Sequence, residues 1–237
     1  MIRDTSRKRV RMASMLLGGM LCVSGGAFLP GCTTALDLRE EAVLALNRGQ
    51  LELALDKATR AVEMDPSSAF NHYELGRVYL ALNRNLEAQY ALEKALAIRP
   101  DDPAFTPDVL DALAEALYRQ DRRANLAAFL EEQVKTYGTT RDYLRQADYL
   151  AKMGDPDAAR VAYRKAAYFA APNDPTPYIA IADFYASIGD EPNAVTALRY
   201  ANYIDPGNRD VAERLRRFGI VPGPTIAEPP PKPELLR

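Results

Sequence analysis

The stretch HYELGRVYLALNRNLEAQYALEKALAIRP, residues 72–100, decides the fold, because much of it repeats residues that stand 34 positions earlier. Pro100 follows Pro66 at this distance, and Ala88 follows Ala54. A fixed period with small residues at set places is typical of helix–turn–helix units, which must stack because one unit alone cannot bury its apolar face. The sequence therefore predicts an all-α solenoid.

The spacing within this stretch resembles the tetratricopeptide repeat (TPR) family, whose pattern is W-x2-L-G-x2-Y…A-x3-F…P. The matching residues are Leu75, Gly76, Tyr79, Ala88, Leu92 and Pro100, with His72 where Trp is usual. Gly76 and Ala88 are small where two helices must cross closely, and Pro100 stops the second helix.

Five copies of the unit fit the chain between residues 35 and 208. They lie near residues 35–68, 69–102, 107–139, 140–173 and 175–208. The third copy lacks the small residue at its second helix crossing, and its phase fits only if 103–106 is a short insertion. Residues 209–219 are apolar at helical spacing and predict a helix that caps the last repeat.

The last segment, residues 220–237, differs in composition from the repeats. Six of its residues are proline, and few are large and apolar. Such a stretch predicts a disordered, mostly polyproline-like tail that packs against no core. Two roles stay open for it, a spacer and a peptide ligand for a partner's aromatic groove.

Residues 1–31 form a different kind of segment. Five basic residues precede an apolar run from Met12 to Leu29, which is short and rich in glycine for a membrane-spanning helix. A basic start, a short apolar middle and a small-residue exit predict a signal peptide.

The ending Leu29-Pro30-Gly31-Cys32 resembles the lipobox of bacterial lipoproteins, with Pro30 in place of the usual Ala, Ser or Thr. This resemblance implies cleavage before Cys32, a palmitate-type lipid on its thiol and a membrane anchor. Thr33 in the next position, by the same resemblance, implies the outer membrane, facing the periplasm. An uncleaved anchor and an ordinary cleaved signal remain the alternatives.

Charge and residue types argue against several functions. Without the leader's five basic residues and one acidic residue, 25 basic and 31 acidic residues remain, a net charge of −6. Nucleic-acid binding requires a basic face, which this composition does not supply. The single histidine, His72, stands at a packing position and has no second His or Cys to form a metal site or a nucleophile–base pair. We expect no enzyme activity, metal, cofactor or small-molecule substrate.

The TPR resemblance implies a concave groove lined by the first helix of each repeat. Among the inward places of the family, the best candidates for binding a protein are Tyr73, Arg77, Tyr118, Arg141 and Arg145. Tyr and Arg carry much of the energy at protein interfaces, although a merely solvated helix face is the alternative for each of them.

Together these features predict a lipid-anchored scaffold of the bacterial envelope. Its plan resembles pilotin and pilus-assembly lipoproteins, which implies a role in assembling a pilus or a secretion system. The alternative is a docking adaptor for cell-wall enzymes or their regulators.

Overall fold

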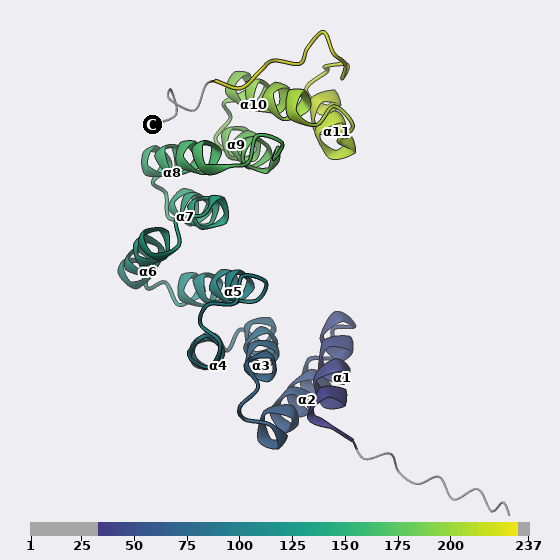
Figure 1. Cartoon of the computed structure of the whole chain (residues 1–237), viewed down its shortest axis with the longest axis vertical. Helices are drawn as coiled ribbons and strands as arrows, with labels where there is room; N and C mark the ends of the chain where they lie inside the picture. Colours follow the sequence, from purple (N-terminus) through teal and green to yellow (C-terminus); the bar gives the residue numbers. More distant parts are fainter. Residues whose placement is uncertain (1–32, 232–237) are drawn as a thin grey trace, which may run out of the picture. The chain divides into compact units, whose positions relative to one another are not determined.

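A computed structural model describes residues 33–231, and this part of the chain contains helices and turns but no strand (Figure 1). Its helices are α1 (Ala35–Asn47), α2 (Leu51–Met64), α3 (Ala69–Ala81), α4 (Asn85–Ile98), α5 (Thr106–Arg119), α6 (Arg123–Thr136), α7 (Thr140–Lys152), α8 (Pro156–Phe169), α9 (Thr176–Ser187), α10 (Glu191–Ile204) and α11 (Arg209–Arg217). The predicted all-α repeat fold, with five helix pairs and a last single helix, is confirmed. The predicted signal peptide and the predicted lipid-bearing Cys32 lie outside the described residues.

The turn inside each helix pair has the same backbone geometry. One residue just after each first helix has a positive φ, which glycine adopts without strain and Asn and Asp tolerate better than other residues. These residues are Gly49 (71°), Asn83 (57°), Asp121 (53°), Gly154 (85°) and Gly189 (77°). This geometry explains why glycine, asparagine or aspartate stands at this one place of each repeat.

Several first helices begin at a side-chain cap. The side chains of Thr34 and Thr139 each accept a hydrogen bond from the backbone N–H three residues later. The aspartate at that later position accepts one from the backbone N–H of the threonine, which completes a capping box. Ser68 caps α3 with its side-chain oxygen. These caps satisfy N–H groups that have no partner inside the helix, and so fix where each unit starts.

Small residues let the two helices of a pair cross closely. A Cβ built on Gly76 of α3 would lie 2.7 Å from Cγ of Leu92 on α4, nearer than side chains approach one another. Ala88 and Leu92 are both fully buried at this crossing. The interior is therefore built from close helix contacts rather than from large side chains.

The first helices form one layer of the stack. Each contacts the first helix of the next pair, from α1 through α3, α5 and α7 to α9, whereas no comparable contact joins successive second helices in the described chain. Helices that lie closer together on one side make that side concave. The first helices therefore line the groove predicted from the repeat pattern.

At the N-terminal end of the stack, two places that are buried and apolar in the second repeat are exposed in the first, and one of them carries a charge. Val78 of α3 is fully buried beside α2, but Leu44, 34 residues earlier on α1, is 53% exposed. Glu41 takes the place that Leu75 holds in the second repeat, and it pairs with Lys57 at 2.6 Å. These charges suit an end helix that faces solvent instead of a preceding repeat.

The start of the C-terminal tail packs against the last helices, so the prediction that it packs against no core is wrong for this part. Ile220 and Ile226 contact the apolar cluster of α9, α10 and α11. Asn202 of α10 donates a hydrogen bond to the carbonyl of Gly223 at 3.3 Å. The few apolar residues among the prolines pack on the last helices of the stack, which composition alone does not reveal.

Gly76→Leu tests the close crossing. The added side chain must displace Leu92, so we expect the free energy of unfolding to fall by about 1–3 kcal/mol in chemical denaturation. Gly207→Leu is the control, because a Cβ at Gly207 meets only an ordinary contact of 3.6 Å. Equal stability of the two variants would contradict this packing account.

Candidate protein-binding groove

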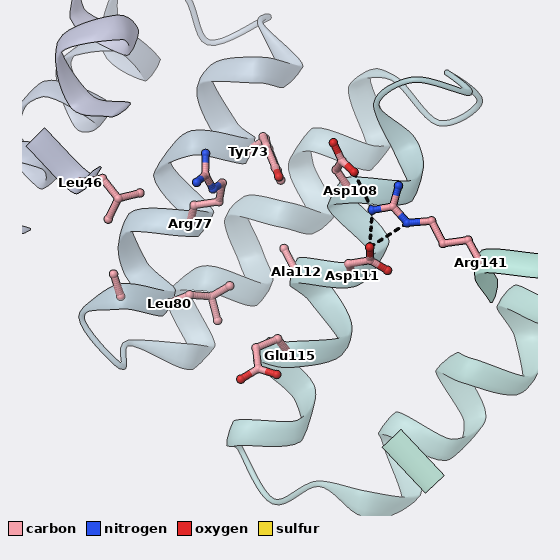
Figure 2. Close-up of a pocket in the computed structure, with 10 residues that line it drawn as sticks. Leu46, Tyr73, Arg77, Leu80, Asp108, Asp111, Ala112, Glu115 and Arg141 are labelled. Carbon is pink, nitrogen blue, oxygen red and sulfur yellow. Dashed lines mark hydrogen bonds and ion pairs between the residues drawn. The ribbon is translucent and has the colours of Figure 1, made fainter. Parts of the chain in front are cut away.

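An open pocket of about 390 Å³ lies on the concave side between α3 and α5. Figure 2 shows side chains of α3 on one side of it and side chains of α5 on the other. Its lining residues are Leu46, Tyr73, Arg77, Leu80, Ala81, Asp108, Asp111, Ala112, Glu115 and Arg141. Aliphatic side chains thus form part of a lining that also carries charged groups of both signs.

One end of the pocket rests on an aromatic cluster. The rings of Tyr73 and Phe105 meet edge to face with centroids 5.5 Å apart, and Phe70 lies 4.6 Å from Phe105 on the same side. Phe105 is only 4% exposed and comes from the short insertion before α5. The insertion therefore supplies the residue that holds Tyr73 in place.

Arg77 contributes a cation to the α3 side. Its guanidinium pairs with Glu74 at 2.8 Å and lies 5.7 Å from the centre of the Tyr73 ring. Burial raises the pKa of the Glu74 carboxyl, and the nearby Arg77 charge opposes that shift. The side chain of Arg77 is 35% exposed, so a partner can still reach it.

Arg141 closes the opposite side of the pocket from α7. It pairs with Asp108 at 2.6 Å and with Asp111, as the dashed lines in Figure 2 show. All three side chains are between 42% and 49% exposed. These ion pairs are open to water and contribute little stability, so a ligand can exchange with them at small cost.

Arg145 does not face a partner, and its predicted role as a binding anchor does not fit the structure. Its side chain is 2% exposed and pairs with Asp142 at 2.8 Å and with Asp111. It also donates a hydrogen bond to the carbonyl of Pro107 at 3.4 Å. Arg145 joins α7 to α5 inside the stack, because α5 presents Asp111 at the point where α7 crosses it.

Tyr118 lies away from the pocket, near the end of α5. Its ring is 36% exposed and packs against Tyr149 with centroids 5.6 Å apart, with Lys152 above it at 5.6 Å. The structure therefore brings together Tyr73, Arg77 and Arg141 but not Tyr118.

Sequence reasoning missed the aliphatic part of the pocket. Leu46 and Leu80 hold the twelfth place of the first and second repeats, one of the places that face inward in the family. The 34-residue spacing between them was the signal that could have identified both.

The described residues contain no group of three or more His, Cys, Asp or Glu side chains that could hold a metal ion. None of the helices between residues 33 and 231 is both long and apolar enough to span a bilayer.

Comparison with known proteins supports the repeat assignment. The family model described as tetratricopeptide repeat matches residues 71–102 and 143–173. No curated protein matches the chain.

Among solved structures, a thermophilic TPR protein of Thermus thermophilus, TTC0263, is similar, with 19% identity over 78% of this chain and 98% of that one and a TM-score of 0.56. A tetratricopeptide repeat protein from Parabacteroides merdae has 16% identity over 78% of this chain and 70% of its own, with a TM-score of 0.57. MamA protein has 17% identity over 80% of this chain and 98% of its own, with a TM-score of 0.51.

The stacked helix pairs and their groove define a helical-repeat scaffold of the kind that binds proteins. Two segments of the chain match the tetratricopeptide repeat family model, and its fold is that of solved tetratricopeptide repeat proteins. Proteins of this family are generally scaffolds rather than enzymes.

The two arginines of α7 give a direct test of their different roles. Arg145→Ala leaves Asp142 buried without its charge partner, and we expect it to cost about 3–5 kcal/mol of stability. Arg141→Ala removes only exposed pairs and should cost less than about 1 kcal/mol. Urea denaturation followed by circular dichroism measures both, and equal losses would refute the assignment of Arg145 to the interior.

Proposed function

We propose that this chain is a lipid-anchored scaffold that holds a segment of a partner protein in the groove between α3 and α5. The observation that carries the proposal is the pocket itself, where Leu46, Leu80 and Tyr73 lie beside the guanidinium of Arg77. Tyr and Arg are enriched among the energetically dominant residues of protein interfaces, and the leucines add apolar area beside them. The partner segment inserts an apolar side chain between the two helices.

The envelope role rests on the leader and its lipobox-like ending. A lipid on Cys32 would hold the repeats at a bacterial membrane. We propose that this is the outer membrane and that the repeats face the periplasm. In that place the scaffold assists the assembly of a pilus or secretion system.

Cys32→Ser should release the protein into the soluble fraction or leave an uncut precursor. Equal labelling of both proteins by a palmitate analogue would exclude the anchor.

Replacement of the groove residues tests the binding site. In the Tyr73→Ala/Arg77→Ala variant, the loss of each side chain that anchors the partner should cost about 2 kcal/mol of binding free energy or more, roughly thirtyfold in affinity. The assay is a pull-down of partner proteins from native membranes, with folding checked by circular dichroism.

The matched control replaces two exposed residues on a second helix. Leu86 and Tyr90 of α4 are 58% and 65% exposed and lie outside the groove, so Leu86→Ala/Tyr90→Ala should retain the partner. Retention by the groove variant together with loss in the α4 variant would contradict the proposed site.

A further inference from the structure

The third helix pair departs from the others at its crossing. Leu126 stands at the fourth place of α6, where every other second helix has a buried alanine. Those alanines are Ala54, Ala88, Ala159 and Ala194. Leu126 is fully buried, so its larger side chain occupies the crossing, and α6 packs on α5 less extensively than the second helix does in any other pair.

A cavity of about 540 Å³ lies among α6, α7 and α8. It is larger than the pocket between α3 and α5, and the two have no lining residue in common. Its lining residues are Ala127, Leu130, Glu131, Val134, Lys135, Tyr143, Gln146, Leu150, Ala158 and Lys165. Because α6 and α8 are second helices, the cavity belongs to the side of the stack opposite the groove.

The cavity combines an apolar surface with cations that have no acidic partner in the described chain. Half-buried Val134 of α6 and Leu150 of α7 provide aliphatic area, and the buried Leu130 lies at the floor of the cavity. Lys135 and Lys165 are exposed, and neither forms an ion pair within residues 33–231. The ammonium of Lys165 lies 5.7 Å from the centre of the Tyr143 ring, and its N–H groups can still donate hydrogen bonds to a carboxylate.

Tyr143 extends this surface toward the end of α8. Its ring stacks on Phe169 with centroids 5.2 Å apart and planes only 3° from parallel. Phe169 is 50% exposed, although large apolar side chains gain by burial. The two lysines outnumber Glu131, the one acidic residue of the lining, so this surface is complementary to a segment that carries both apolar and acidic side chains.

We propose that the cavity among α6, α7 and α8 is a second protein-docking site, which takes an acidic amphipathic segment of a partner. The apolar side chains of that segment contact Val134, Leu150 and Tyr143, and its carboxylates pair with Lys135 and Lys165. The site is independent of the groove between α3 and α5, so the scaffold can hold two protein segments at once.

A synthetic peptide tests this site without a known partner. The probe is a fluorescent peptide with leucine at every third or fourth position and glutamate elsewhere, and the same peptide with lysine for glutamate is its control. Fluorescence anisotropy with the protein should show saturable binding of the acidic peptide only. Absence of that binding, or tighter binding of the basic peptide, would overturn the proposal.

Paired variants then locate the bound peptide. Ala127→Trp fills the cavity and should weaken binding at least tenfold, while Ala128→Trp, on the next residue of α6 and outside the cavity, should not. Lys165→Glu should weaken it at least tenfold, while Arg164→Glu, an equal change of charge on the neighbouring residue, should have little effect. Equal losses within either pair would overturn the proposal.

The groove variant Tyr73→Ala/Arg77→Ala separates the two sites. It should bind the acidic peptide as the unmodified protein does, since it changes no residue of the cavity. If it loses the peptide, the probe binds in the groove and the second site is wrong. If vesicles of an anionic phospholipid bind through Lys135 and Lys165 while the peptide does not, the cavity recognises a lipid surface and the proposal fails.

Discussion

The close crossing of paired helices is the constraint on which the structure depends. Gly76 lies so near Leu92 that no side chain fits between them, and buried alanines take the corresponding role in the other well-packed pairs. Close crossings leave little room for large core residues, so stability comes from many similar contacts between neighbours. Separate contacts between successive first helices place them side by side along the groove.

The third repeat is where this regularity changes, and it borders both proposed binding sites. The insertion before α5 brings Phe105 under Tyr73 and so supports the pocket on the concave side. Leu126 lies at the crossing of α5 and α6, and α6 also lines the cavity on the other side of the stack. Buried Arg145, which pairs with Asp142 on its own helix, joins α7 to α5 through Asp111 and the carbonyl of Pro107. A repeat that matches the family pattern poorly thus carries much of what is particular to this chain.

The sequence predicted features that depend on local chemistry. The 34-residue period, the turn residues Gly49 and Asn83 and the helix-stopping prolines all act within one unit, so the helix pairs could be predicted. The burial of Arg145 could not, since it depends on where α7 crosses α5. Contact of Ile226 with the last helices likewise follows from the stacking and not from the tail's composition.

The central claim is that a partner segment lies between α3 and α5, and site-specific photo-cross-linking tests it most directly. A benzophenone amino acid placed at Leu80, in the pocket, or at Leu86, on the outer surface of α4, would be activated in cells that make the full chain. The account predicts a cross-linked partner from position 80 and none from position 86. A partner captured from position 86 alone would contradict it.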